Sequence, residues 1–146
     1  MKLVVQRVSK AQVTNKTSGD IVGKIDKGYL VLLGVGKDDD EKEIKPLVEK
    51  LAKLRVMSDS QDKMNLSLND AGGEILVVSQ FTLYADISGG NRPSFINAAD
   101  GKKAKIFYEL FIEKLKSLGL NVSTGAFGEY MEIEASLDGP VTIIYS

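Results

Sequence analysis

The chain has 146 residues, and its hydrophobic content of 43% suits one compact domain with a substantial core. No run of about 18 apolar residues occurs, so we expect no membrane span and no membrane partner. The 19 basic and 20 acidic residues give a net charge of −1, without the basic surplus usual in proteins that bind a long nucleic acid.

The chain contains neither histidine nor cysteine. This excludes Ser-His-Asp and Cys-His triads, histidine bases, disulfides and nearly all zinc sites. Catalysis would therefore use hydroxyls, carboxylates, lysines, backbone dipoles or the substrate itself, and we expect no metal and no cofactor. The stretch Met1–Arg7 is too short and too soon interrupted for a signal peptide, so we expect a cytoplasmic location.

The first third of the chain favours strands. Lys2–Val8 alternates loosely and predicts a strand that ends before Ser9. Ala11–Thr14 and Ile21–Ile25 flank the polar, Gly-containing segment Asn15–Asp20, which is typical of a hairpin. An all-apolar run follows and predicts a central strand over Tyr29–Val35.

A helix is predicted next. The acidic cluster Asp38–Glu41 suits a helix start, because acids interact favourably with the helix dipole there. Apolar residues then recur at helical spacing from Ile44 to Leu54. Pro46 requires that the helix begin near Glu43–Lys45 or kink at the proline.

The remaining elements alternate between strand and helix. Met64–Leu68 and Ile75–Val78 predict strands, and Tyr84–Ser94 predicts a loop. A second helix should start near Asp100 and stop at Gly119. Its core face should carry Phe107, Leu110, Phe111, Leu115 and Leu118, and the segment 122–145 predicts strands. This order implies an α/β fold, with a mixed sheet or two packed sheets and two main helices on one side, in a single domain over residues 1–146.

The segment Ser79-Gln80-Phe81-Thr82-Leu83 follows the buried strand Ile75–Val78. In α/β proteins, the carboxyl end of such a strand is a common position for functional side chains. The residues alone also fit a strand end with polar side chains and a buried Phe81. Together with Asn91–Phe95, Thr124–Gly128 and Asp138–Thr142, in the same order and spacing, the segment resembles the D-aminoacyl-tRNA deacylase family. The resemblance runs from Val4 to Ile144 and implies a three-layer α/β/β arrangement and a homodimer.

The resemblance also implies a substrate pocket. Ser79, Gln80, Phe81 and Thr82 would line it, with hydroxyl and backbone N–H groups around the ester carbonyl. Phe127, Gly128 and Met131 would lie beside the terminal adenine, where an aromatic face can stack on a base, although an aromatic and a methionine four residues apart are more often core.

Gly139-Pro140 would ordinarily indicate a turn. The resemblance implies a cis bond that enters the partner subunit's pocket and excludes an L side chain by clash. Arg7 would hold this loop in orientation. Leu137 stands where the family commonly has asparagine, which weakens one local hydrogen bond.

The activity that the resemblance implies is hydrolysis of the ester between a D-amino acid, or glycine, and the terminal ribose of tRNA. This is a proofreading reaction of translation quality control, with the tRNA acceptor end as partner. Thr82 could be a nucleophile, but no obvious base accompanies it, so we favour help from the ribose 2′-hydroxyl. One alternative is a non-enzymatic tRNA-end binding module related to synthetase editing domains; another is a Thr- or Ser-based amidohydrolase.

Charged residues outside these motifs suggest little chemistry. Arg92, Lys102, Lys103 and Lys105 could contact phosphates, although a solvated helix start explains the lysines equally well. We interpret Asp38–Glu41 as a helix start and Glu132 with Glu134 as a solvent face, rather than as metal sites.

Overall fold

The computed structural model describes residues 1–146 and shows strands wrapped around one side of a helix pair. Its main sheet contains β1 (Lys2–Asn15), β2 (Ile21–Ile25), β3 (Gly28–Gly34), β6 (Glu74–Ser79), β7 (Asn121–Thr124) and β8 (Met131–Tyr145). A separate small sheet pairs β4 (Met57–Ser58) with β5 (Met64–Leu66).

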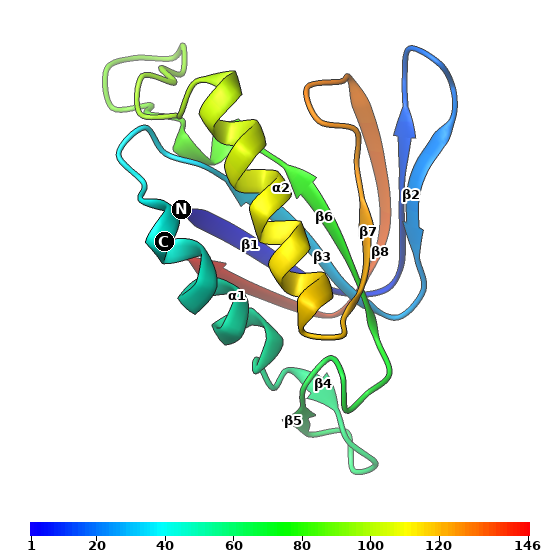
Figure 1. Cartoon of the computed structure of the whole chain (residues 1–146). Coiled ribbons are helices and arrows are strands. Elements are labelled where there is room, and N and C mark those ends of the chain that lie inside the picture. Colours follow the sequence, from blue (N-terminus) through cyan, green and yellow to red (C-terminus); the bar gives the residue numbers. More distant parts are fainter.

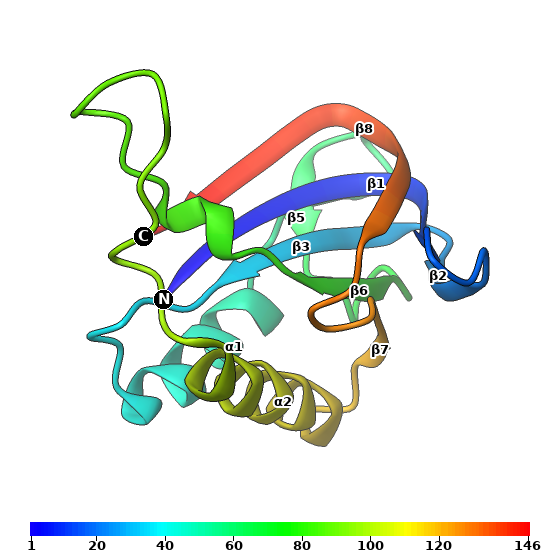
Figure 2. The same ribbon diagram turned by 90° about the horizontal axis from the view of Figure 1, so that it is seen from above.

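The helices lie together on one face of the main sheet, as Figure 2 shows. They are the 3-10 turn η1 (Glu41–Glu43), α1 (Ile44–Ala52) and α2 (Gly101–Ser117), while a second 3-10 turn, η2 (Phe81–Tyr84), follows β6. Asp40 caps η1 by accepting a hydrogen bond from the Lys42 N–H, which confirms that the acidic cluster starts a helix. None of the helices combines the length and the hydropathy that a membrane-spanning helix requires.

The main sheet is mixed and strongly bent. Strands β3, β6 and β7 are parallel to one another, whereas β1 runs antiparallel to β2, β3 and β8. The first half of β1 pairs with β3 and its second half with β2. As a result, β2 and part of β8 lie over the face of the sheet opposite the helices. Gly23 of β2 lies so close to β7 that an added Cβ would meet the Thr124 carbonyl oxygen at 2.2 Å.

Two separate apolar cores result from this bend. The larger contains 20 buried residues between the sheet and the helices, including Tyr29, Phe111 and Leu115. The smaller lies between the two β layers and consists of Val8, Ala11, Val13, Ile25, Leu30, Leu76 and Val78. The fold therefore has a helix layer and two β layers, and it agrees with the expected α/β class.

Most of the expected elements are present, with two corrections. The first strand does not end before Ser9: β1 continues to Asn15, because Ser9 and Lys10 are exposed at an irregularity in the pairing with β8 that does not interrupt the strand. Leu118 is not a core residue, since α2 ends at Ser117 and leaves Leu118 43% exposed. Pro46 lies in the first turn of α1, where a missing N–H costs nothing.

Candidate active site

The parallel strands bring two loops together at their carboxyl ends. The Gln80 N–H donates to the Leu33 carbonyl at 2.8 Å, and the Gly125 N–H donates to the Val77 carbonyl at 3.1 Å. The Val77 carbonyl also accepts from the Tyr108 hydroxyl at 2.7 Å. Burial raises the pKa of Tyr108 to about 12, so the hydroxyl remains a donor at neutral pH. These bonds fix the starts of η2 and of the loop that joins β7 to β8.

The predicted catalytic segment is open to solvent. Phe81 is 54% exposed and its ring edge contacts Phe95 with ring centroids 5.0 Å apart, so the alternative interpretation of a strand end with a buried Phe81 is wrong. Thr82 is exposed, and its hydroxyl accepts a hydrogen bond from the Gln80 side-chain amide. No carboxylate or amine contacts that hydroxyl, whereas Ser79 and Gln80 are half-buried at the base of the segment.

The far end of η2 is anchored by Tyr84, a residue that the sequence did not single out. Its hydroxyl donates to Asp39 at 3.1 Å, and Asp39 also accepts from the Gly36 N–H at 2.6 Å and pairs with the Met1 ammonium at 2.7 Å. Burial by itself raises the pKa of Asp39, but these donors together hold it below its usual range. The Lys2 ammonium adds a bond to the Leu83 carbonyl at 3.2 Å.

The predicted adenine-side residues lie on the neighbouring loop. Phe127 is half-buried and packs against Tyr108, with centroids 5.6 Å apart, so part of its ring belongs to the core. Met131 accepts from the Ala126 N–H through its sulfur at 3.3 Å, and Gly128 turns the chain with a φ of +76°. The fold therefore brings these three residues to the same end of the sheet as Ser79–Thr82.

Gly139 and Pro140 lie in a second cluster around Arg7, and their peptide bond is cis. Arg7 is 8% exposed and donates to the carbonyl of Asp138 at 3.0 Å and to that of Val56 at 2.9 Å. It also reaches the Ser58 hydroxyl at 3.2 Å and the Asp138 carboxylate at 3.3 Å. Nothing in the sequence around Val56 and Ser58 indicated that they would hold this arginine.

The two clusters are far apart within one chain. Arg7 pairs across the sheet with Tyr29, whereas Ser79 is level with Leu33, four positions further along β3. Four residues of strand correspond to about 13 Å, and the three strand spacings from β8 to β6 add a lateral separation of about 14 Å. The structure thus does not bring Gly139-Pro140 to the Ser79–Thr82 segment of the same chain. Leu137, the departure from the family pattern, pairs with Val8 and is 50% exposed.

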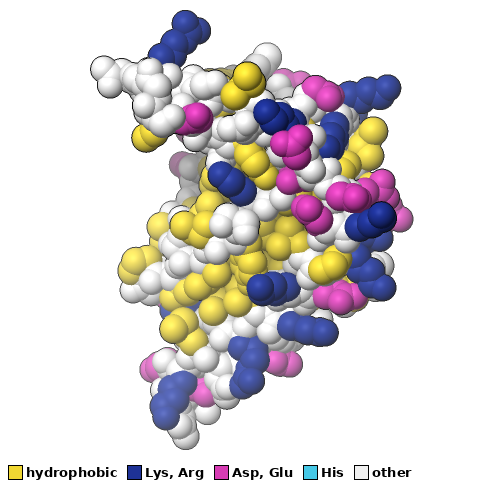
Figure 3. Space-filling view, turned by 90° about the vertical axis from the view of Figure 1, so that its left-hand side faces the viewer, with side chains coloured by type: hydrophobic (Ala, Val, Ile, Leu, Met, Phe, Trp, Pro, Cys, Tyr) yellow, Lys and Arg dark blue, Asp and Glu magenta, His cyan; other side chains and the backbone are white.

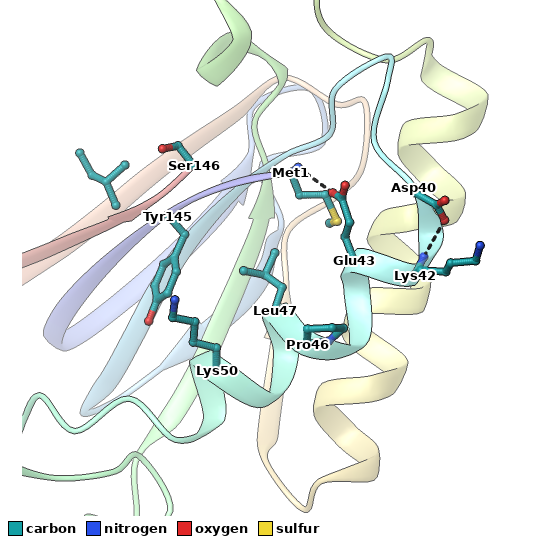
Figure 4. A pocket seen from close by; sticks show the side chains of 10 residues that line it. Met1, Asp40, Lys42, Glu43, Pro46, Leu47, Lys50, Tyr145 and Ser146 are labelled. Atoms are coloured by element: carbon teal, nitrogen blue, oxygen red, sulfur yellow. Dashed lines mark hydrogen bonds and ion pairs between the residues drawn. The ribbon is translucent and has the colours of Figure 1, made fainter.

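A hollow also lies away from both clusters. It has a volume of 760 Å³ and lies between α1 and the end of β8, where Pro46, Leu47 and Tyr145 are among its apolar lining residues (Figure 4). The Lys50 ammonium lies over the Tyr145 ring at 5.5 Å. None of the predicted site residues lines this hollow.

The predicted phosphate-binding cations differ in their surroundings. Lys103 donates to the Lys37 carbonyl at 2.7 Å, and Lys105 approaches Glu109 at 3.9 Å, so both have contacts within the chain. Arg92 is exposed in the loop after η2 and forms no ion pair. Glu132 pairs with Lys16 at 3.2 Å, and Glu134 accepts from Gln12 at 2.7 Å, on the solvent face as expected.

Comparison with known proteins agrees with the fold. The sequence model of the D-Tyr-tRNA(Tyr) deacylase family matches residues 4–146. D-aminoacyl-tRNA deacylases of Lacticaseibacillus casei and Thermosipho melanesiensis are 53% and 52% identical to the chain, each over 145 residues. These alignments cover 99% of the chain and 97% and 95% of the two relatives, respectively.

Two solved structures match almost completely. A protein described as c-Myc DNA Unwinding Element Binding Protein has a TM-score of 0.92 and 41% identity, over 100% of this chain and 98% of its own. A probable eukaryotic D-amino acid tRNA deacylase has a TM-score of 0.83 over 99% of this chain and 97% of its own, and its 15% identity shows a shared fold alone. The sequence relatives define a class of hydrolases that act on aminoacyl-tRNA. The chain belongs to the D-aminoacyl-tRNA deacylase family.

Proposed function

We propose that the chain hydrolyses the ester between a D-amino acid, or glycine, and the terminal ribose of tRNA, and that it spares L-aminoacyl-tRNA. The observation that carries the proposal is the open segment Ser79–Thr82 at the carboxyl end of β6 in a chain of this family. Release of the free amino acid and intact tRNA would make the protein a cytoplasmic proofreading enzyme of translation.

The proposed mechanism depends on orientation and on the substrate's own groups. The Thr82 hydroxyl has only the Gln80 amide as a partner, and an amide cannot remove its proton. The first N–H groups of η2 have no side-chain cap, which leaves donors for a developing oxyanion. An aminoacyl ester already carries an activating ammonium and a neighbouring 2′-hydroxyl, so positioned water is sufficient for hydrolysis.

The proposed chiral wall is Gly139-Pro140 of a second copy of the chain. Within one chain the loop is separated from Ser79 by about 13 Å along the strands, so it cannot line its own pocket. In a homodimer, the loop of each subunit would instead enter the pocket of its partner. Figure 3 shows an apolar patch on the side of the molecule where both chain ends lie in Figure 1, and such a patch favours contact with a second copy of the chain.

A rigid backbone wall suits discrimination by clash. Arg7 braces Asp138, directly before Gly139, and is itself held by Val56 and Ser58. An L side chain would point at such a wall, whereas a D side chain or the hydrogen of glycine would not. Phe127, Gly128 and Met131 would receive the terminal adenine on the opposite side of the scissile ester.

The primary experiment compares matched D- and L-aminoacyl-tRNA and glycyl-tRNA, with and without EDTA. We expect hydrolysis of the D and glycyl esters in both conditions and little action on the L ester. Binding of the charged acceptor end without turnover would favour the non-enzymatic module instead. Loss of activity in EDTA that a divalent ion restores, with the tRNA still folded, would contradict a reaction without metal.

A heterodimer tests whether the wall acts between subunits. Thr82→Phe should block a pocket but leave the wall intact, and Pro140→Gly should remove the wall but leave the pocket open. In a purified heterodimer of the two, the open pocket receives an intact wall, so the D-to-L preference should recover. An unchanged preference relative to the Pro140→Gly homodimer would show that the loop acts within its own chain.

A further inference from the structure

Phe95, on the loop between η2 and α2, forms an exposed aromatic pair with Phe81, the first residue of η2, and the proposed ester pocket uses only Phe81 of the two. Phe95 is 37% exposed and Phe81 54% exposed, although phenylalanine is ordinarily buried. Their rings meet edge to face, 71° apart, so a face of at least one ring is left to solvent. Phe81 directly precedes Thr82 in the chain, so the pair adjoins the predicted catalytic segment.

The loop presents these rings from a defined frame. Asp86 and Ser94 exchange two backbone hydrogen bonds of 2.8 and 2.9 Å, immediately before Phe95. The Phe95 carbonyl accepts from the Ala98 N–H at 3.0 Å, and Ala98 forms a bridge with Gly36 next to β3. Phe95 is therefore anchored on both sides in sequence, and its exposure is built into the fold.

The same loop carries an uncompensated positive charge. Arg92 lies between Asp86 and Phe95, is exposed and forms no ion pair. The Asp86 carboxylate is occupied by the Ser88 N–H at 2.9 Å. An exposed aromatic face and a free guanidinium on one loop form the combination that binds one base and one phosphate of a single strand.

We propose that Phe95, together with the exposed face of Phe81, stacks on the cytidine that precedes the terminal adenosine of tRNA, and that Arg92 contacts the adjoining phosphate. This inference rests on the proposed function, because it extends the substrate by one nucleotide from the ester pocket. Every tRNA ends in the single-stranded sequence CCA, so the subsite would serve all tRNAs alike. It would add affinity through one base and one phosphate, in keeping with the net charge of −1.

The test uses two substrates with the same D-amino acid, namely D-aminoacyl-adenosine and a D-aminoacyl-CCA trinucleotide. The wild-type protein should show a higher kcat/KM for the trinucleotide, mainly through KM. Phe95→Leu should lower the ratio of the two kcat/KM values about tenfold, within the range for loss of one stacked base. Ile96→Ala is the matched control, since Ile96 is 72% exposed on the same loop but has no aromatic face, and it should leave the ratio unchanged.

Arg92→Gln should reduce the salt dependence of the trinucleotide KM by about one phosphate contact, a slope change of about 0.7. Equal losses on both substrates in Phe95→Leu would mean that Phe95 only supports Phe81, and would overturn the subsite. A dimer that dissociates in Phe95→Leu would show that a second copy covers the pair, which also overturns it. Equal wild-type rates on both substrates would reject the subsite alone, whereas failure to hydrolyse any D-aminoacyl ester would reject the proposed function itself.

Discussion

The two predicted parts of the site, Ser79–Thr82 and Gly139-Pro140, differ in how the protein holds them. The Ser79–Thr82 segment is open, and its side chains make few contacts apart from the bond between Gln80 and Thr82. The Gly139-Pro140 loop is exposed too, but behind it the buried Arg7 makes four contacts to three residues in two separate segments. One region leaves room for a substrate, and the other is braced to resist displacement without any pocket of its own. This difference fits the proposal that the Ser79–Thr82 segment forms the substrate pocket and that Gly139-Pro140 of the other subunit forms its wall.

The largest effect should come from filling the open region. Thr82→Phe adds an aromatic ring at an exposed position, so the fold should tolerate the substitution. The ring should nevertheless displace the substrate ester from its position in the pocket. We expect kcat/KM on D-aminoacyl-tRNA to fall by at least about 100-fold, the cost of a displacement near 1 Å. Thermal unfolding should be nearly unchanged, and a variant with wild-type kinetics would show that the ester lies elsewhere.

The braced region should respond differently. Arg7→Ala removes the donors that hold Asp138, Val56 and Ser58, and we expect the D-to-L ratio of kcat/KM to fall about tenfold, equivalent to 1.4 kcal/mol. Stability should fall as well, because buried carbonyls lose charged donors at about 1–3 kcal/mol. Ser58→Ala is the control, because it removes only one partner of Arg7 and should have a smaller effect on both quantities. A large loss of stability with unchanged selectivity would leave Arg7 a structural residue only.

A smaller effect is expected when the Thr82 hydroxyl alone is removed. Thr82→Ala should retain activity within about tenfold of the wild type, because no base is placed to make this hydroxyl a nucleophile. Removal of a true nucleophile costs about 10⁶-fold in a well-studied protease. Mass spectrometry after rapid quench adds a second readout, and a trapped acyl-threonine would overturn the substrate-assisted route.

An effect on stability is expected at the anchor of η2. Asp39→Asn should lower the free energy of unfolding at pH 7 by about 1.5–3 kcal/mol through loss of charged hydrogen bonds. Since the pKa of Asp39 in the folded state is below its unfolded value near 3.9, its contribution is complete above that value and is lost as pH falls through the folded pKa. The difference between wild type and variant should therefore be constant from about pH 5 to 7 and shrink below about pH 4. Denaturant titrations across this range measure it, and a difference that grows on acidification would be inconsistent with a depressed pKa.

Local patterns were sufficient for much of the fold. The apolar runs of β3 and β6, the hairpin before Ile25 and the helix stop at Gly119, whose φ is +81°, follow from periodicity and backbone chemistry. These features depend on residues that are close in sequence, so the local sequence pattern predicts them. The continuity of β1 past Ser9 was missed, because a polar pair at a pairing irregularity has the same local pattern as a strand end.

For the candidate site too, some features follow from the sequence and others only from the tertiary structure. The order of motifs in the chain determined the family and the candidate residues from Ser79 to Pro140. Only the tertiary structure decided that Phe81 is exposed against Phe95, that Tyr84 reaches Asp39, and that Arg7 is held by Val56 and Ser58. The structure also set the separation of Gly139-Pro140 from the pocket. The bend of β1 and the parallel pairing of β3 with β6 fix which distant residues meet, and such long-range contacts have no signature in any one stretch of sequence.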